Sequence, residues 1–480
     1  MLAAMPPTSP TPVNRDEAPV RERGDACPGA LRLHAADDGR LARLRLPAGV
    51  LTHHQAEVLE SAAERLGDGH LDITSRGNIQ LRGLGESCGG QLARVLYDAG
   101  LLPSEAHERI RNIVASPLAG LDGQGWGRSP GPERNQGPEQ GRSSAHSVQL
   151  WSKELDELLC ASATATALSG RFLFALDDGR GDVAALGADV TLLAQRYGTA
   201  TLHIQTNPSG WRVSATDAAR AALVAAETFL TVAEAGGSGA WRIRELPAGH
   251  GLEAAVTTRL AEAGIAAARE PAADREPGTA AGPPAPGAVR SPDGTVALSV
   301  HAPLGRLSVA QWRMLRTAAT AHGSLRVTPW RGVVVPGLAP DAADALLDRL
   351  RTAGLITDPG SPWHGIGACT GRAGCAKSLS DVRTDAARAL GRPPLRPPPR
   401  QLPLLPAPDL PVHWSGCARR CGHPQGTSWV DVVATGEGTY DVSVDGGART
   451  TAAGQRAEQA AGQELADAVA AARTTPTMTR

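Results

Sequence analysis

The fold is decided by a stretch that occurs twice, LRLPAGVLTHHQAEVLESAAERLGDGHLDITSRGNIQLRGL (residues 44–84) and VHAPLGRLSVAQWRMLRTAATAHGSLRVTPWRGVVVPGL (residues 300–338). Each copy predicts a short strand, a turn with Pro and Gly, a helix, and two strands around a turn in which Thr74 corresponds to Thr328. A further helix ending in AGL follows each copy. The agreement in order and length favours gene duplication and a pseudo-twofold α+β protein over chance similarity of two α/β segments.

Polar, Gly-rich and Pro-rich stretches divide the chain around these copies. The expected order is small module, larger module, small module, larger module. The predicted boundaries are a disordered N-terminus at 1–26, a small module at 27–104, a larger module at 105–262 with a flexible insert at 122–146, a linker at 263–288, a small module at 289–358, a larger module at 359–447 with a Pro-rich insert at 391–411, and a flexible tail at 448–480.

The composition argues against several classes of function. The chain has 480 residues and a formal net charge of -1, which gives no sign of binding to nucleic acids or to membrane surfaces. No apolar run approaches the roughly 18–20 residues of a membrane span. The first residues lack a basic segment followed by an apolar core, so we expect no secretory signal and a cytoplasmic location. Clustered cysteines in the cytosol more often bind metal or perform redox chemistry than form disulfides.

Four of the seven cysteines gather in two short segments. Cys369 and Cys375 have the spacing C-x5-C, which is looser than the C-x2–4-C knuckles of structural zinc sites. Cys417 and Cys421 have the spacing C-x3-C, which on a helix places both sulfurs on one face. The set fits a [4Fe–4S] cluster held by four thiolates, with two unrelated buried pairs as the alternative. Small buried or free thiols are expected at Cys27, Cys88 and Cys160.

Three segments resemble the nitrite/sulfite reductase superfamily, whose members hold a [4Fe–4S] cluster beside a siroheme. TSRGNIQLRG (74–83) is similar to its T-x-R-x-x-x-Q tetrapyrrole-binding segment, ERIRNIVASPLAG (108–120) to its R-N segment, and GCARRCGHP (416–424) to its second cysteine segment. The resemblance implies a duplicated α+β architecture with two ferredoxin-like half-domains and two larger α/β sulfite-reductase-type domains. It also implies that the sulfur of Cys421 lies nearest the tetrapyrrole.

The second group of candidate site residues consists mainly of arginines. Siroheme-like macrocycles carry many carboxylates, and the planar fork of arginine meets a carboxylate with two parallel hydrogen bonds. Residues 76, 78, 80 and 82 alternate along one predicted strand and face one side, which makes an anion-binding row. The alternative is a solvated outer face, with Ile73, Ile79 and Leu81 pointing inward. The expected substrate-binding residues are Arg45, Arg76, Asn78, Gln80, Arg82, Arg111, Asn112 and Arg171.

The stretch LSGRFLFALDDG (168–179) distinguishes between branches of the superfamily. Sulfite-reducing members carry two lysines in a K-F-K segment, and Arg171 and Leu173 stand in their places here. Leucine supplies neither charge nor protons, which argues against sulfite or nitrite reduction. The segments GDACPGALRLHAADDGRLARLRLPAG, RFLFALDDGRGDV and CTGRAGCAKSLSDVRTDA are similar instead to the precorrin-3B synthase branch.

Resemblance to that branch implies an oxygenase of aerobic cobalamin biosynthesis. Such enzymes hydroxylate C20 of precorrin-3A with O2 and form a γ-lactone with the ring A acetate, and the resemblance implies an electron-transferring [4Fe–4S] cluster and a non-heme iron. The chain shows no G-x-G-x-x-G that opens a βαβ unit, so we expect NAD(P)H electrons to arrive through a separate reductase or ferredoxin. The duplication supplies an internal pseudo-dimer, which makes a monomer plausible.

The ligands of a mononuclear iron stay open. Such iron often uses two histidines and a carboxylate, but no H-x-D/E motif followed by a distant His stands out. His364 and His413 each precede a cysteine segment, although a lone histidine is more often structural. Asp177 and Asp178 are equally well explained as turn residues. The other candidates are His53, His54, His301 and His423.

Two other functions compete with the oxygenase. A siroheme-dependent assimilatory nitrite or sulfite reductase would hold siroheme as a permanent cofactor and show strong visible bands. A catalytically inert tetrapyrrole-binding or redox-sensing protein would keep the cysteines and arginines without turnover. An iron–sulfur protein without siroheme would show only a broad absorbance near ~400 nm.

Overall fold

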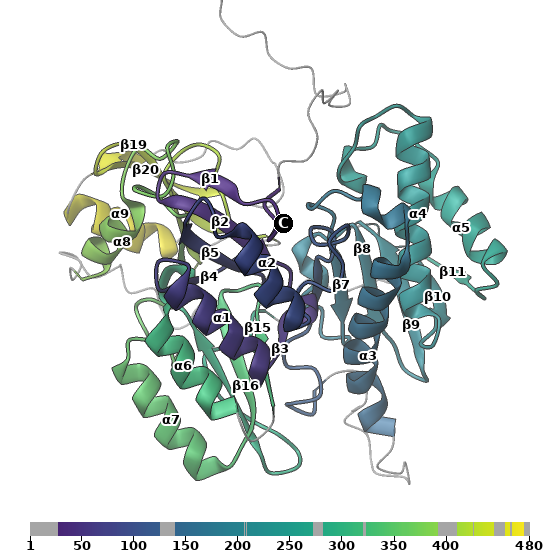
Figure 1. Ribbon diagram of the computed structural model, residues 1–480, viewed down its shortest axis with the longest axis horizontal. Coiled ribbons are helices and arrows are strands. Elements are labelled where there is room, and N and C mark those ends of the chain that lie inside the picture. The colour runs from purple at the N-terminus through teal and green to yellow at the C-terminus, as the bar shows by residue number, and fades with distance from the viewer. Residues whose placement is uncertain are drawn as a thin grey trace, which may run out of the picture.

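The computed structural model describes residues 27–124, 140–205, 207, 209–271, 282–319, 323–391, 410–425, 427–445, 457–460 and 463–474. Two small half-domains pack together, and the first larger domain (teal) lies beside them in Figure 1. The second larger domain, which includes the yellow segments, lies at the other side of the first half-domain. The expected disordered N-terminus at 1–26 falls outside the described residues.

Each half-domain sheet contains one strand from the other half. In the first sheet, β14 pairs antiparallel with β4, so that Arg306 stands opposite Asp72. In the second, β3 pairs with β15, and Leu51 stands opposite Leu325. The first sheet has the order β1 (His34–Ala36), β2 (Gly39–Leu44), β5 (Ile79–Leu84), β4 (His70–Ile73), β14 (Arg306–Ser308). The second has the order β12 (Gly287–Arg290), β13 (Val296–His301), β16 (Gly332–Leu338), β15 (Ser324–Val327), β3 (Val50–Thr52).

A short turn directs each exchanged strand into the other half. The turns Pro47–Gly49 and Pro303–Gly305 hold Ala48 at φ 54° and Leu304 at φ 53°, so the two copies share the same unusual backbone. Gly49 has φ 68°, and a Cβ there would collide with the carbonyl oxygen of Val327. Only glycine therefore fits where the first turn crosses the second sheet.

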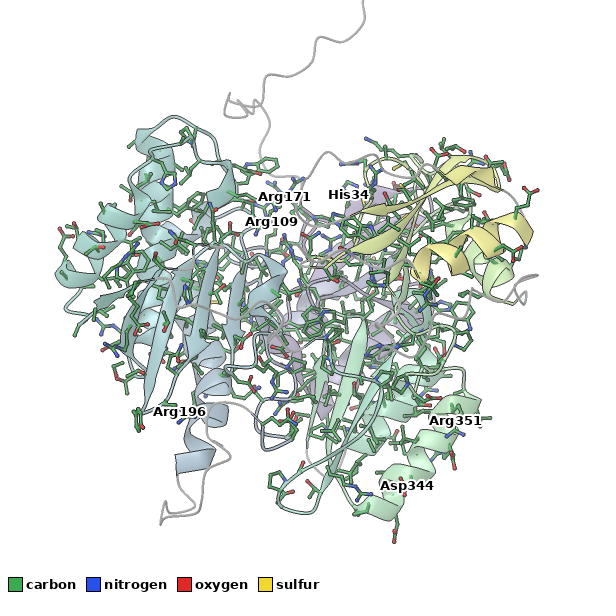
Figure 2. All side chains as sticks on the ribbon, turned by 180° about the vertical axis from the view of Figure 1, so that it is seen from behind. His34, Arg109, Arg171, Arg196, Asp344 and Arg351 are labelled. Carbon is green, nitrogen blue, oxygen red and sulfur yellow. The ribbon has the colours of Figure 1, made fainter. Side chains whose placement is uncertain are left out.

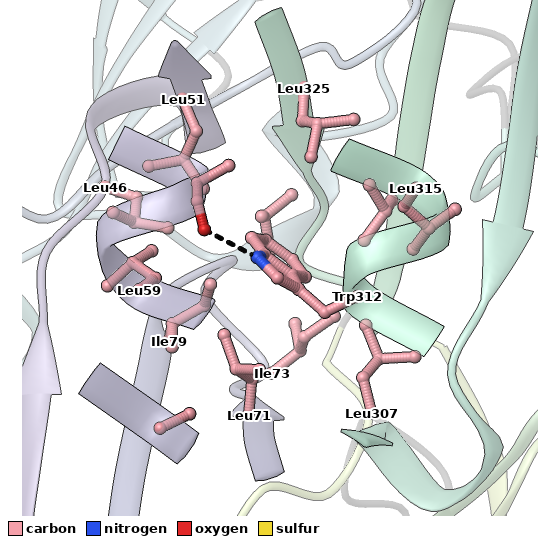
Figure 3. Close-up of a cluster of buried hydrophobic side chains, with 14 of the residues drawn as sticks. Leu46, Leu51, Leu59, Leu71, Ile73, Ile79, Leu307, Trp312, Leu315 and Leu325 are labelled. Atoms are coloured by element: carbon pink, nitrogen blue, oxygen red, sulfur yellow. Dashed lines mark hydrogen bonds between the residues drawn. The ribbon is translucent and has the colours of Figure 1, made fainter. Parts of the chain in front are cut away.

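The helices that follow the exchanged strands form a shared core. α1 (His53–Arg65) and α6 (Val309–Ala318) each begin with a capping box, at Thr52 and Ser308. Trp312 of α6 is fully buried, and its indole Nε1 donates to the carbonyl oxygen of Ala56 at 2.8 Å (Figure 3). Apolar side chains from both halves surround it: Leu46, Leu51, Leu59, Leu71, Ile73, Ile79, Leu307, Leu315 and Leu325. The half-domains therefore bury one core jointly.

The two larger domains repeat a common plan. Each begins with parallel strands, so that the loops after these strands meet at one edge of the sheet. The first sheet has the order β11 (Ala268–Glu270), β10 (Gly210–Ser214), β9 (Thr199–Ile204), β8 (Val190–Ala194), β7 (Phe174–Asp177), β6 (Ile113–Ala115), with helices α3 (Gln140–Ala161), α4 (Ala218–Ala235) and α5 (Leu252–Glu262). The second has β17 (Ile366–Ala368), β18 (Val412–Ser415), β19 (Trp429–Gly436), β20 (Thr439–Asp445), β21 (Ala457–Ala460), with α8 (Val382–Leu390) and α9 (Gln463–Arg473).

The predicted duplicated α+β architecture is confirmed, with α2 (Gly89–Asp98) and α7 (Pro340–Thr352) as the repeated final helices. Three expected connecting segments contain regular structure. Residues 140–146 of the insert begin α3, and the linker contains β11. The expected tail contains β21 and α9, because Leu465, Ala466 and Val469 bury an apolar face of that helix. The rest of the two inserts and of the linker lies largely outside the described residues, at 125–139, 392–409 and 272–281.

None of the described helices combines enough length with enough apolar character to cross a bilayer.

Candidate functional site

The four clustered cysteines lie where the parallel strands of the second larger domain end. Cys369 directly follows β17, and Cys417 follows Gly416 at the end of β18. The Gly416 N–H donates to the sulfur of Cys369 at 3.2 Å. Cys417 and Cys421 lie in a turn and not on a helix, and Arg420 between them takes a left-handed φ of 48°. The loop wraps backbone around the sulfurs instead of presenting one helix face.

The four thiols share one electrostatic neighbourhood. Burial raises the pKa of Cys369; the N–H groups of Gly416 and Gly371 oppose this rise, while Cys421 and Cys375 add to it. Burial also raises the pKa of Cys421, and Cys417 and Cys375 act in the same direction. Ionising several of these thiols together is therefore unfavourable without a compensating positive charge.

The donor set fits a cluster better than a single ion. Among the described residues, no three His, Cys, Asp or Glu side chains are grouped as they would be around one metal ion. Four thiols on neighbouring loops, with the Gly416 N–H directed at the sulfur of Cys369, suit a [4Fe–4S] cluster. The same finding means that the six candidate histidines, all of them described, form no mononuclear iron site with described partners.

The first half-domain holds the cysteine loop in place. Arg82 donates to both oxygens of Asp38, at 2.7 and 2.8 Å, and to the carbonyl oxygen of Gly374 at 2.6 Å. A Cβ on Gly374 would lie 2.7 Å from Nη2 of Arg82, so only glycine lets the loop approach this closely. Arg43 donates to Gln80 at 3.0 Å, and its charge lowers the pKa of Cys421. This sheet face therefore borders the cysteine site.

A second group of side chains converges on one backbone carbonyl, that of Gly170. Its oxygen accepts from Asn112 Nδ2 at 2.7 Å, from Arg45 Nη2 at 3.4 Å and from Arg76 Nη1 at 3.4 Å, and the thiol of Cys27 donates at 3.6 Å. A carbonyl oxygen has two lone pairs, so four donors exceed what it can satisfy. Two guanidinium groups therefore lie at one carbonyl oxygen.

Arg242 adds a third guanidinium that the sequence analysis missed. Burial lowers the pKa of Arg76 to about 9, and the charges of Arg242 and Arg45 act in the same direction. Arg242 pairs with the buried Asp189 and donates to the carbonyl oxygen of Gly187 at 2.8 Å. It stands in no recognised segment, so nothing in the local sequence distinguishes it from other arginines. We call Arg45, Arg76 and Arg242 the guanidinium cluster.

Two further arginines lie at the edge of this cluster. Figure 2 shows Arg109 and Arg171 close together on the first larger domain. Arg171 is exposed and stacks over the ring of Trp241 at 4.7 Å. The carbonyl oxygen of Arg109 accepts from Arg45 Nε at 3.0 Å. Arg109 was not among the predicted residues, although it stands in the predicted R-N segment.

The structure separates the predicted residues into two groups. Arg45, Arg76 and Asn112 meet at Gly170, and Asn78 joins them by donating to Asn112 Oδ1 at 3.1 Å. Arg111 instead forms a two-pronged ion pair with Asp156, at 2.6 Å for each contact. Arg82 likewise pairs with Asp38, as described above. Asn78, Gln80 and Arg82 are buried, at 2, 7 and 3% exposure, so their strand face is not a solvated outer face.

The first larger domain fills the corresponding place with a carboxylate network. Ser116 follows β6 as Cys369 follows β17, and the Asp178 N–H donates to Ser116 Oγ at 3.1 Å as the Gly416 N–H donates to Cys369. Ser116 Oγ in turn donates to Asp182 Oδ1 at 2.6 Å. The same place at the strand ends is therefore occupied by a hydrogen-bonded network in the first larger domain and by four thiols in the second.

This network predicts a pH-dependent stability. Burial, followed by the charge of Asp177, raises the pKa of Asp182 to about 7. The folded state then binds the proton more tightly than the unfolded state, so stability falls as pH rises from about 4 to about 7. We expect Asp182→Asn to stabilise the protein by on the order of 2 kcal/mol at pH 8 and by nothing below pH ~4. Urea unfolding at both pH values, with Asp348→Asn as an exposed control, measures this; a pH-independent difference contradicts it.

Known proteins resemble this chain both in its two half-domains and along most of its length. The profile of the nitrite/sulfite reductase ferredoxin-like half domain matches residues 34–87 and again residues 289–353, which fall in the two half-domains. The chain is 27% identical over 448 residues to a precorrin-3B synthase of Sinorhizobium sp, covering 92% of this chain and 88% of that protein. It is 26% identical over 415 residues to a ferredoxin–nitrite reductase of Synechococcus elongatus, covering 80% and 74%.

A solved structure supports the fold as well. The structure of the Mycobacterium tuberculosis NirA protein matches 89% of this chain and 79% of its own, with a TM-score of 0.60 and 18% identity. The duplicated half-domains, the similarity to curated relatives along most of the chain and this structural match lead to one conclusion. The chain carries two nitrite/sulfite reductase ferredoxin-like half domains, and it resembles a precorrin-3B synthase and a ferredoxin–nitrite reductase over most of its length.

Proposed function

We propose that this chain is a precorrin-3B synthase-like monooxygenase, which hydroxylates C20 of precorrin-3A with O2 and allows the ring A acetate to close a γ-lactone. The observation that carries the proposal is the guanidinium cluster. Arg45 and Arg76 meet at the carbonyl oxygen of Gly170, and Arg242, paired with Asp189, lies close enough for its charge to lower the pKa of Arg76. A macrocycle with many carboxylate arms suits such a group of guanidinium groups.

The pattern of cations supports a large substrate over a small oxyanion. A small anion such as nitrite needs two close cations at one point, and Leu173 takes the place of the second lysine of the reducing enzymes. Leu173 is 4% exposed and packs in an apolar cluster with Val114 and Val183. Arg171 stacks on Trp241 at the edge. The positive charge therefore extends from the guanidinium cluster to Arg171, which suits several separate carboxylates.

Cys369, Cys375, Cys417 and Cys421 would hold a [4Fe–4S] cluster, which supplies electrons singly when bound. The proposed reaction places one oxygen atom in the substrate and releases the other as water, which takes two electrons and two protons. The guanidinium cluster orients the macrocycle by binding its carboxylate arms. The buried Asn78 and Asn112, which are hydrogen-bonded to each other, keep the backbone beside the cluster in place. No described residues form a mononuclear iron site, so we assign no step to such an iron.

Electrons would come from an external NAD(P)H-dependent reductase or a ferredoxin in the cytoplasm. A surface groove of ≈ 490 Å³ reaches Cys417 and is lined in part by Lys377, Leu379 and Arg420. This groove offers a donor protein access to the cysteine site, and we propose that the chain acts as a monomer because its halves already pair internally.

One experiment separates the candidate functions. The protein is purified anaerobically, its visible spectrum and its iron and sulfide are measured, and precorrin-3A, a reductant and O2 are added. The proposed enzyme shows no siroheme bands and yields a product heavier by one oxygen atom. Tightly held siroheme with nitrite or sulfite turnover establishes the reductase instead. Binding of precorrin-3A without any product establishes an inert tetrapyrrole-binding protein.

A further inference from the structure

Arg331 has an unusual backbone at a place where the other half-domain uses glycine. It lies in the turn between β15 and β16 with φ 59°, and its counterpart in the first copy, Gly77, has φ 65°. The two turns share their hydrogen bonds, because the N–H of Thr74 donates to Asn78 O and that of Thr328 to Gly332 O, each at 2.9 Å. Side chains rarely adopt this left-handed conformation, so the arginine is retained at a cost in strain.

The side chain of Arg331 extends into the cysteine loop. Its Nη2 donates to the carbonyl oxygen of Gly422, the residue after Cys421, at 2.6 Å. A Cβ on Gly422 would lie 2.9 Å from Nη2, and a Cβ on Gly367 would lie 2.7 Å from Nη1. Two glycines thus leave room for the guanidinium beneath the loop, and a larger residue at either position would displace it.

The charge of Arg331 has no carboxylate partner in the part of the chain that the structure describes. Among the described residues no Asp or Glu forms an ion pair with it. Burial lowers the pKa of Arg331 to about 10 and the nearby Arg383 lowers it further, whereas Cys369 has the opposite effect. A buried cation without an anion is unfavourable, so the geometry calls for negative charge at the cysteines.

We propose that Arg331 is the fixed counter-cation of the four-cysteine site and raises the reduction potential of the cluster bound there. The inference rests on the proposed function, which places a [4Fe–4S] cluster on these thiols. Four thiolates make such a cluster anionic, and reduction adds one more negative charge. A guanidinium held beneath Cys421 and beside Cys369 stabilises the reduced form more than the oxidised form.

The test is a redox titration monitored by electron paramagnetic resonance on the full chain. Arg331→Gln keeps donors near Gly422 but removes the charge. We expect the ratio of reduced to oxidised cluster at a fixed solution potential to fall about tenfold, a shift of 59 mV for a one-electron couple. Arg331→Lys keeps the charge and should stay near the wild-type potential. Arg388→Gln removes an exposed charge in the same domain and should change nothing, because water screens it.

The possible outcomes distinguish this inference from the proposed function. An unchanged potential in Arg331→Gln, or equal shifts in the glutamine and lysine variants, overturns the role of Arg331 while the cluster assignment stands. Cluster assembly in the lysine variant but not in the glutamine variant supports the role, and failure of both overturns it in favour of a structural role. A wild-type protein without any cluster signal overturns the cluster assignment and this inference together.

Discussion

Replacing Cys421 by serine will remove the proposed iron–sulfur cluster from the protein. We expect iron and sulfide to fall from about four of each per chain to well under one, with loss of the broad absorbance near ~400 nm. The reason is that a serine hydroxyl stays protonated and ligates iron poorly, while the remaining thiols border one another. Cys417→Ser should behave alike, because both residues lie on one loop.

The control for this result is Cys88→Ser. Cys88 precedes α2 in the first half-domain, and its thiol donates to the carbonyl oxygen of Gly85 at 3.1 Å. A serine can make the same bond, so iron and sulfide should stay at the wild-type level. Wild-type iron content in both Cys421→Ser and Cys417→Ser would exclude these residues as cluster ligands. Metal analysis and circular dichroism together separate cluster loss from unfolding.

Replacing Arg76 by glutamine will weaken the binding of precorrin-3A, the proposed substrate, about 100-fold, from the loss of ~2–3 kcal/mol of charge-assisted hydrogen bonding. Arg76 lies beside Arg45 and Arg242 with a pKa lowered to about 9, first by burial and then by their charges. Removing it relieves repulsion in the ligand-free protein, so the free energy of unfolding should not fall. Binding and stability are therefore expected to respond in opposite directions.

Fluorescence titration for the dissociation constant and urea unfolding for stability measure the two effects. Arg351→Gln is the matched control, because Arg351 lies on α7, far from Arg109 and Arg171 in Figure 2, and its side chain is 64% exposed. It should change neither quantity. Parallel loss of binding and stability in Arg76→Gln would show that Arg76 supports the fold, and unchanged binding would remove it from the site.

Local sequence patterns were sufficient for the architecture. The repeated order of strand, turn, helix and strands predicted two half-domains, and both appear with matching capping boxes and matching turns. The exchange of β3 and β14 was not predicted, because a three-residue strand carries no information about its partner. The structure of α9 was missed as well, since an Ala-rich segment after a polar stretch has little apolar periodicity to distinguish it from a tail.

The candidate site was predicted only in part, and the assignment of its residues stays a prediction. The spacing of Cys369, Cys375, Cys417 and Cys421 singled out the cysteine set before any coordinates. The arginines were harder to assign. The sequence around an arginine does not show whether a carboxylate of the protein itself pairs with it in the fold. The fold brings Asp38 to Arg82 and Asp156 to Arg111.

The sequence by itself determined the duplication, the α+β class and the grouping of four cysteines, because these depend on the order and spacing of neighbouring residues. Only the tertiary structure decided which arginines lie together and which face a carboxylate. It brings Arg45 and Arg76 from distant parts of the chain to Gly170, with Arg242 close enough to lower the pKa of Arg76, and it places Arg331 beneath the cysteine loop. The physical reason is that charge compensation is settled by contacts across the fold, which local patterns do not encode.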